Sequence, residues 1–163
     1  MDTKTQKVMF SSKSNEWETP QNFFDKLNRK HKFTLDPCCT ASTAKCKKYY
    51  TAEDNGLHKS WKDEVVFVNP PYSEIGDWVK KAYYESVNNN AKVVMLIPSR
   101  TDTKYWHDYI MESASSIHFV KGRLKFGSAN SKGNSAPFPS AVVVFDASKF
   151  RWTSKMNVTS MER

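Results

Sequence analysis

Four consecutive residues, Asn69-Pro70-Pro71-Tyr72, carry the groups needed to hold an amino group beside a flat ring. The Asn69 amide oxygen and the Pro70 carbonyl form a pair of acceptors, which suits an NH2 group with two hydrogens. The prolines fix φ and stiffen the turn, and Tyr72 offers a π surface on which a nucleobase would stack. The alternative is a strand that ends in a proline turn, with Tyr72 packed into the core. The residues that lead into this turn favour the chemical interpretation.

The stretch VVFV at 65–68 is short, β-branched and apolar on both faces, which is typical of a central parallel strand. KVVMLI at 92–97 predicts a second such strand. Because ligands bind at the carboxyl ends of strands in doubly wound sheets, Asn69 stands where a site is expected. Strands 116–120 and 141–145 follow each other without a helix, which predicts a hairpin and one antiparallel strand. A helix is predicted to begin at Thr19-Pro20, and further helices are predicted over 40–48, 73–87 and 103–113. Additional strands are predicted at 33–36 and 49–51.

The length of 163 residues predicts one domain. We assign 1–15 to a flexible N-terminal arm, 16–150 to the domain and 151–163 to a C-terminal tail without clear structure. The long loop 121–138 is rich in Gly, Ser, Asn and Pro, and loops of this length are usually functional or disordered. The fold class is therefore α/β, with a mostly parallel sheet and helices on both faces.

A net charge of +8 favours a polyanionic partner such as nucleic acid, although a basic surface without a specific partner is the alternative. No apolar run is long enough to span a bilayer, and the N-terminus has no signal core, so we expect a soluble cytoplasmic protein. The odd cysteine count argues against a disulfide framework. Adjacent cysteines suit a tetrahedral metal poorly, and we expect no metal; the three are Cys38, Cys39 and Cys46.

The tetrapeptide at 69–72 resembles the catalytic motif of amino-methyltransferases that use S-adenosylmethionine (SAM). An ordered set of motifs extends the similarity to the phage-type DNA N-6-adenine methyltransferase (Dam) family. These motifs are WETP at 17–20, LDPC at 35–38, EDNGL at 53–57 with Trp61 after it, NPPY, LIPSRTDT at 96–103 and APFPSAVVVF at 136–145. The ordered set is far more specific than NPPY alone.

The resemblance implies a Rossmann-like SAM-dependent methyltransferase fold and sequence-specific methylation of adenine N6 in double-stranded DNA, by a phage-derived protein in the cytoplasm of a bacterial host. The target base would be flipped out of the duplex. Asn69 and the Pro70 carbonyl would accept both N6 hydrogens, Pro71 would stiffen the turn, and Tyr72 would stack on the ring. An NPPY enzyme acting on RNA or on protein glutamine is an alternative, as is an inactive DNA-binding relative.

The resemblance also implies a cofactor site for SAM. Asp36 would bind its amino group, and Asp54 its ribose or adenine, with Glu53 as the rival. The turn after the first strand, DPCCTAST, has no glycine, so small side chains would have to allow the close approach. Asp36 capping a helix, Trp17 in the core and Asp54 in a solvated turn are the alternatives. The implied cofactor-binding residues are Trp17, Thr19, Pro20, Asp36, Pro37, Cys38, Asp54 and Asn69.

Basic and aromatic side chains beyond the second central strand predict DNA contacts. Arg100 would bind a phosphate or a base edge, or else it is an ordinary surface arginine. In the 121–138 loop basic residues alternate with aromatic ones that would either contact DNA or pack back onto the sheet. The predicted substrate-binding residues are Tyr72, Arg100, Arg123, Lys125, Phe126 and Phe138.

Overall fold

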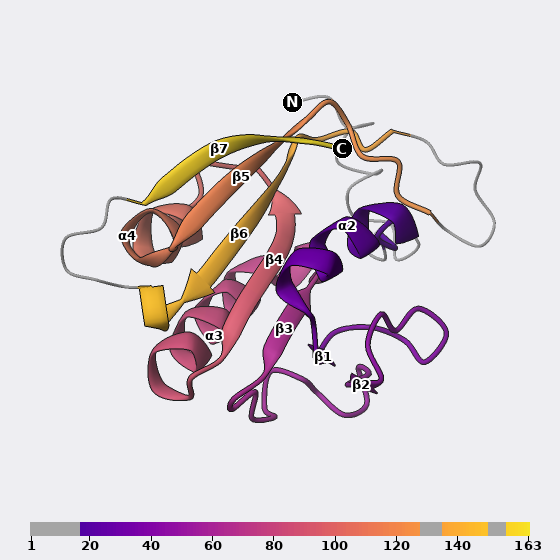
Figure 1. The fold of residues 1–163 in the computed structure, drawn as a ribbon, viewed down its shortest axis with the longest axis vertical. Coiled ribbons are helices and arrows are strands. Elements are labelled where there is room, and N and C mark those ends of the chain that lie inside the picture. The colour runs from indigo at the N-terminus through magenta and orange to yellow at the C-terminus, as the bar shows by residue number, and fades with distance from the viewer. Residues whose placement is uncertain (1–16, 128–134, 150–155) are drawn as a thin grey trace.

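The chain folds around one twisted sheet of seven strands in the order β2-β1-β3-β4-β6-β5-β7 (Figure 1). The structure is a computed structural model that describes residues 17–127, 135–149 and 156–163. The strands are β1 Leu35–Asp36, β2 Lys48–Tyr49, β3 Val65–Val68, β4 Lys92–Pro98, β5 Ser116–Lys121, β6 Ser140–Asp146 and β7 Asn157–Glu162. The helices are α2 Gln21–His31, η1 Tyr72–Glu74, α3 Ile75–Asn88, η2 Trp106–Ile110, α4 Met111–Ser113 and η3 Ala147–Lys149.

The first four strands are parallel to one another, as the alternation of strands and helices predicts. β6 runs antiparallel between β4 and β5, so the predicted antiparallel hairpin strand is confirmed. The prediction that the C-terminal tail lacks structure is wrong for its last part. β7 pairs in parallel with β5 over six residues, from Ser116↔Asn157 to Lys121↔Glu162, and forms the edge of the sheet.

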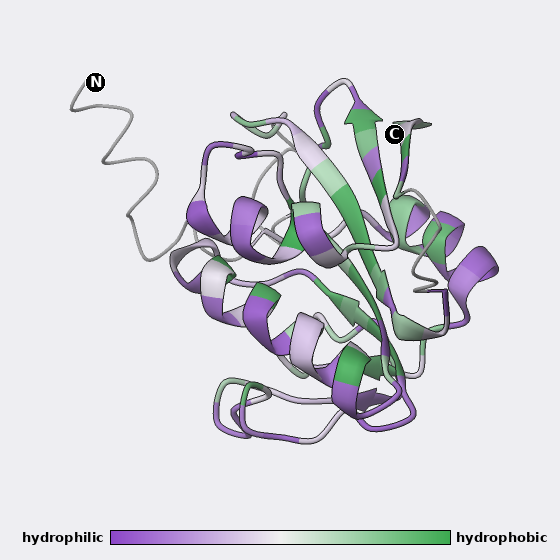
Figure 2. Ribbon diagram, turned by 90° about the vertical axis from the view of Figure 1, so that its left-hand side faces the viewer, coloured by the Kyte–Doolittle hydropathy of each residue, from purple (hydrophilic) through white to green (hydrophobic). Residues whose placement is uncertain are grey.

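Helices cover both faces of the sheet, as predicted. On one face α2 packs Phe23, Phe24 and Leu27 against side chains of β3, β4 and β6. On the other face α3 packs Trp78 and Val79, together with η2, against the opposite side chains of the same strands. These central strands are apolar along most of their length (Figure 2). Successive side chains of a strand alternate between faces, so Asn69 follows Phe67 onto the α2 face.

Two local predictions fail because side chains compete with the backbone. The predicted helix at 40–48 is a turn, in which the hydroxyls of Thr40 and Thr43 each accept a hydrogen bond from the other residue's backbone N–H, at 3.2 and 3.0 Å. Such local bonds offer the chain an alternative to a helix. Thr19 does not cap α2; the cap position is Pro20, without a side-chain hydrogen bond. The Thr19 hydroxyl is used elsewhere.

The turn before Trp61 lies directly on the loop after β1. A Cβ at Gly56 would stand 2.0 Å from the Pro37 carbonyl oxygen, so only glycine allows this approach. The Trp61 indole N–H donates to the Gly56 carbonyl at 3.0 Å and holds the turn in place. The EDNGL motif with its tryptophan therefore sets the position of the loop that follows Asp36.

Candidate functional site

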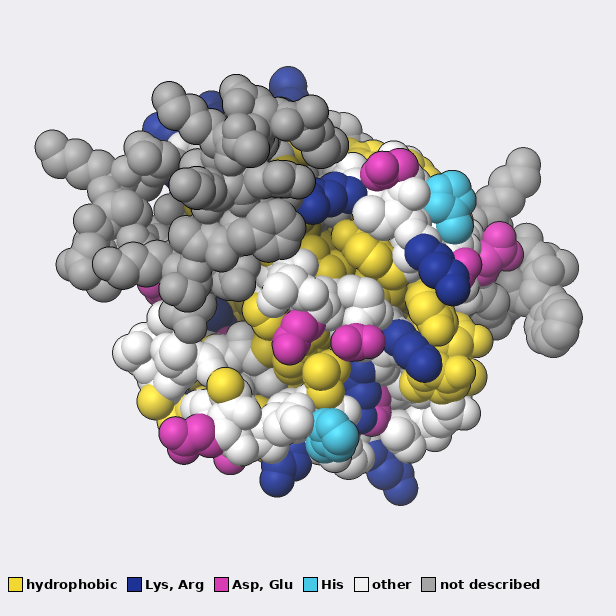
Figure 3. All heavy atoms as spheres, turned by 180° about the vertical axis from the view of Figure 1, so that it is seen from behind, with side chains coloured by type: hydrophobic (Ala, Val, Ile, Leu, Met, Phe, Trp, Pro, Cys, Tyr) yellow, Lys and Arg dark blue, Asp and Glu magenta, His cyan; other side chains and the backbone are white. Residues whose placement is uncertain are grey.

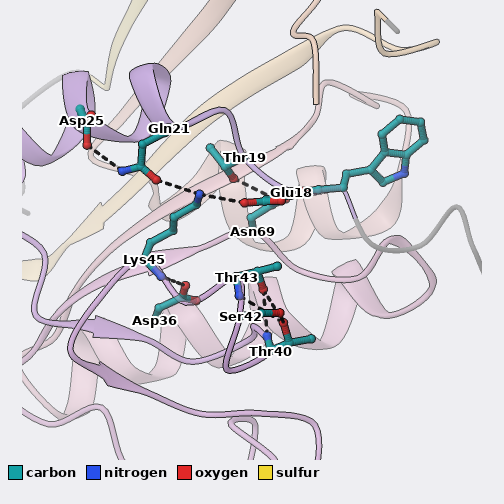
Figure 4. Close-up of polar contacts among 11 residues, drawn as sticks. Glu18, Thr19, Gln21, Asp25, Asp36, Thr40, Ser42, Thr43, Lys45 and Asn69 are labelled. Atoms are coloured by element: carbon teal, nitrogen blue, oxygen red, sulfur yellow. Dashed lines mark hydrogen bonds and ion pairs between the residues drawn. The ribbon is translucent and has the colours of Figure 1, made fainter. Parts of the chain in front are cut away.

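The Asn69 side chain lies at the carboxyl end of β3 and is fixed through its nitrogen. Asn69 Nδ2 donates to the Trp17 carbonyl at 2.5 Å and to the Thr19 hydroxyl at 3.0 Å (Figure 4). The other atom of the amide, Oδ1, is buried and has no hydrogen-bond partner. Buried polar atoms are rarely left unpaired, because each costs the free energy of its lost hydration. An oxygen in this state is an acceptor ready for a ligand N–H.

The orientation of this amide follows from its partners. A backbone carbonyl has no proton to donate, so the atom that faces the Trp17 carbonyl has to be the nitrogen. The oxygen then points away from the 17–19 segment. Two stiff residues follow: Pro70 is buried, and Pro71 is extended with φ −61° and ψ 135°. Asn69 therefore presents an acceptor of defined identity, as the sequence predicts.

Tyr72 opens η1, and both of its contacts with neighbouring rings are made inside the protein. Its ring stacks on Trp17 with centroids 6.2 Å apart and receives Phe138 edge-on at 5.0 Å. Phe126 and Phe138 also contact Trp17, which completes an aromatic cluster of four side chains: Trp17, Tyr72, Phe126 and Phe138. Burial raises the pKa of the Tyr72 hydroxyl far above its usual value, an effect that the nearby Arg100 charge opposes, so this hydroxyl stays neutral.

The two loop phenylalanines do not face the solvent as substrate contacts would. Phe126 is 3% exposed and Phe138 8%, and both pack against the α2 face of the sheet. This is the alternative that the sequence left open. Trp17 is half-buried and packs against the same face. In this arrangement the π surface of Tyr72 meets Trp17 and Phe138 where a nucleobase was expected.

Asp36 ends β1 with a carboxylate that is only 3% exposed. Its Oδ2 accepts the backbone N–H of Lys45 at 3.0 Å, and burial raises its pKa in spite of this bond. It caps no helix, because the segment after it forms none. A buried carboxylate without a bridging cation is expensive, which makes Asp36 a suitable partner for a ligand ammonium group.

The loop after β1 is bonded to the NPPY turn. The Cys38 thiol donates to the Asn69 backbone carbonyl at 3.2 Å. Burial raises the Cys38 pKa well above its usual value, so the sulfur keeps the proton it donates. Pro37 is held against Gly56 on the other side of the loop. Of the predicted residues Asp36, Pro37 and Cys38, Cys38 is therefore bonded directly to Asn69, and the other two precede it in the chain.

The structure adds charged residues that the sequence did not single out. Lys45 Nζ pairs with Glu18 Oε1 at 3.3 Å and donates to Gln21 Oε1 at 3.0 Å (Figure 4). These contacts join the loop after β1 to the segment that starts with Trp17. No local pattern reveals them, since the partners are 27 and 24 residues apart.

Asp54 lies in an exposed turn and has a structural partner there. Its Oδ2 accepts the Thr51 backbone N–H at 2.9 Å and the Thr51 hydroxyl at 3.0 Å. These two bonds lower the pKa of Asp54. The solvated turn that the sequence offered as the alternative is therefore present, and Glu53 is exposed beside it. A contact of either carboxylate with a cofactor stays a prediction.

Comparison with known proteins places the chain in a family. A family model described as "DNA N-6-adenine-methyltransferase (Dam)" matches residues 5–163. The chain belongs to this family. The membership confirms the resemblance predicted from the ordered motifs.

Two curated relatives are named "DNA N-6-adenine-methyltransferase". A protein of Escherichia phage T1 is 32% identical over 110 residues, which cover 66% of this chain and 45% of that protein. A protein of Haemophilus phage HP1 (strain HP1c1) is 34% identical over 113 residues, which cover 68% of this chain and 65% of that protein. The chain thus spans about half to two-thirds of the length of these relatives.

The three basic residues predicted to contact DNA differ in exposure. Arg123 and Lys125 are exposed, and Arg100 is half-buried near Tyr72. The base of the loop that carries Arg123 and Lys125 is held by isolated β-bridges between Lys125 and Ser135 and between Glu18 and Gly127. Residues 128–134 of this loop lie outside the described residues. On the face shown in Figure 3, Lys and Arg side chains are interspersed with acidic ones instead of forming one continuous patch.

Within 17–127, 135–149 and 156–163, no three His, Cys, Asp or Glu side chains are grouped so that they could hold a metal ion. Over the same described residues, no helix is both long and apolar enough to cross a bilayer.

Proposed function

We propose that this protein transfers a methyl group from SAM to the N6 amino group of adenine in double-stranded DNA, on a Rossmann-like methyltransferase fold. The observation that carries the proposal is the buried, unpaired Oδ1 of Asn69, held at the carboxyl end of β3 by two bonds to its nitrogen. Membership of the Dam family supports the choice of adenine N6 as the acceptor.

The acceptor pair explains how a weak nucleophile would be activated. The lone pair of adenine N6 is delocalised into the ring, so the nitrogen must move towards sp3 geometry before it attacks. The Asn69 Oδ1 and the Pro70 carbonyl would accept the two N6 hydrogens and stabilise the positive charge that develops on the nitrogen. Because the Asn69 nitrogen is held by Trp17 and Thr19, the oxygen needs no reorientation when the base arrives.

The donor set around β1 fits SAM. Asp36 would supply a buried carboxylate for the ammonium group, and Trp17, Thr19 and Pro20 would contact the cofactor from the N-terminal segment. SAM carries no phosphate, so the absence of a glycine-rich cradle in DPCCTAST does not conflict with it. When bound, SAM supplies an electrophilic methyl group.

The aromatic cluster sets a condition for access of the base. Enzymes that modify bases take the target out of the helical stack. Tyr72 can stack on a flipped adenine only if Trp17 or Phe138 moves off its ring. Arg123 and Lys125, which are exposed, would bind the DNA backbone around the opened site, in keeping with the net charge of +8.

The test is transfer of radiolabelled methyl from SAM to duplex DNA that lacks N6-methyladenine, followed by separation of the nucleosides. We expect label in N6-methyladenine, lost with Asn69→Ala. The matched control is Asn88→Ala, an exposed asparagine of α3 whose side chain bonds the Tyr84 carbonyl. Label that appears in RNA or protein glutamine and not in DNA would overturn the substrate. A protein that binds DNA and no SAM would overturn the enzymatic function.

A further inference from the structure

Lys45 is an unusually buried lysine placed between the two segments that border the proposed cofactor space. Its side chain is only 8% exposed. At one end its backbone N–H bonds the Asp36 carboxylate, and at the other its ammonium contacts Glu18 and Gln21 (Figure 4). Asp36 ends β1 and Lys45 lies in the loop after it, whereas Glu18 lies in the N-terminal segment and Gln21 opens α2. One residue therefore connects the two.

The contacts continue from Lys45 to the reacting centre. Glu18 stands between Trp17 and Thr19, the two residues whose oxygens hold the Asn69 nitrogen. The Glu18 carbonyl also accepts the Gly127 N–H at 3.1 Å, which ties the same segment to the 121–138 loop. The position of the Glu18 side chain thus affects the orientation of the Asn69 amide and the place of the Trp17 ring.

A buried ammonium is costly unless it is paired, and an ion pair between buried groups is weak support for stability alone. Here the partner is not deeply buried, because the Glu18 side chain is 37% exposed. A lysine that only served the packing of its loop would gain more by reaching solvent. Its inward direction, towards a segment 24–27 residues away, is what a connecting role requires.

We propose that Lys45 is a positioning residue that fastens the 17–21 segment to the loop after β1 and so keeps the cofactor site assembled before SAM arrives. This inference rests on the proposed function. Without the ammonium, the segment would be in place for only a fraction of the time. The apparent Kd for SAM is then the intrinsic Kd divided by that fraction. Saturating SAM would restore the assembled state, so kcat would change little.

The experiment compares SAM binding by calorimetry and methyl transfer for four variants of the full chain. Lys45→Met keeps the apolar stem and removes the charge. The Glu18 carboxylate that loses its partner is 37% exposed, so water can solvate it. We expect its Kd and KM for SAM to rise at least about tenfold, with kcat at saturating SAM within about threefold of the parent. Glu18→Gln should weaken binding less, since the amide oxygen still accepts. Lys48→Met, which breaks the more exposed pair with Glu64, is the matched control and should bind SAM normally.

Two further readouts separate positioning from a direct ligand contact. Amide hydrogen exchange of the peptide that contains residues 17–21 should be faster in Lys45→Met and slow again when SAM is saturating. The double variant with Glu18→Gln should lose no more affinity than Lys45→Met alone, because both changes break one connection. Binding of decarboxylated SAM should fall by the same factor as binding of SAM.

Three results would overturn the inference. Unchanged SAM affinity in Lys45→Met would show that the segment needs no fastening. Loss of affinity for SAM but not for its decarboxylated form would make Lys45 a direct partner of the ligand carboxylate. Additive effects of the two changes would show that Lys45 and Glu18 act separately. Failure of the parent protein to bind SAM is a different outcome, which overturns the proposed function as well.

Discussion

Replacing Asn69 with alanine should separate stability from activity. The change removes the two Nδ2 bonds, to the Trp17 carbonyl and the Thr19 hydroxyl, which together contribute about 2 kcal/mol at about 1 kcal/mol each. It also removes a buried carbonyl that has no partner, which costs the folded state about 1–3 kcal/mol. The two effects nearly cancel. We expect the free energy of unfolding to change by no more than about 1 kcal/mol, a shift in Tm of about 2–4 °C.

Asn69→Asp, although nearly isosteric, should be worse for the fold than alanine. It directs a carboxylate at the Trp17 carbonyl, where the native amide donates, so two oxygens repel each other in a buried site. We expect a loss of at least about 2 kcal/mol, or about 4–8 °C in Tm. Asn69→Ala should lose at least about 100-fold in kcat, the usual effect of removing one group that stabilises developing charge.

The assays are thermal unfolding of the unliganded proteins and methyl transfer at saturating SAM and DNA. The decisive comparison is the order of stability, with the parent and Asn69→Ala close together and Asn69→Asp below both. An alanine variant that is destabilised by more than about 3 kcal/mol would show that the unpaired oxygen carries no cost in the folded protein. Activity retained in Asn69→Ala would refute the role of the amide oxygen as an acceptor.

Three other changes test the surroundings of the site. Asp36→Asn should weaken SAM binding and leave the stability at pH 7 equal or higher, because burial raises the pKa of Asp36 and makes its ionised form costly. The stability difference between variant and parent should vanish below the usual aspartate pKa, where both side chains are neutral. Unfolding measured as a function of pH would show this. Gly56→Ala should lower Tm by at least about 4 °C, since its Cβ would strike the Pro37 carbonyl at 2.0 Å. Tyr72→Phe should keep kcat within about threefold, whereas Tyr72→Ala should lose about 5- to 150-fold in kcat/KM, the equivalent of 1–3 kcal/mol of stacking.

The central part of the fold could be predicted from the sequence because local signals and tertiary environment agree there. The runs at 65–68 and 92–97 are apolar on both faces and become central strands, and 75–88 has the period of a helix with one buried side. β7 could not be predicted, because five of its six residues are exposed and its pattern carries no burial signal. It is a strand only because β5 offers it an edge.

The site was predictable to the extent that its chemistry lies in one short motif. An acceptor role for Asn69 can be predicted from its residue type and its place after β3. Its partners Trp17 and Thr19 are 52 and 50 residues away, so the family resemblance could predict their place near a cofactor but not which atoms of Asn69 they hold. The phenylalanines of the 121–138 loop were misleading, because alternating basic and aromatic residues fit both DNA contact and packing. Their burial is decided by the sheet face beneath them.

The glycine that a cofactor turn usually needs is present in this fold, but in a neighbouring loop. The turn after β1 keeps side chains at every position and uses one of them, the Cys38 thiol, to hold the Asn69 carbonyl. The close backbone approach takes place instead between Pro37 and Gly56. A glycine in place of Cys38 would give up the thiol bond and loosen the link between the loop after β1 and the NPPY turn. A side chain at position 56 would displace that loop. The contact of Pro37 with Gly56 and the bond from the Cys38 thiol to the Asn69 carbonyl therefore fix the loop after β1 without a glycine of its own.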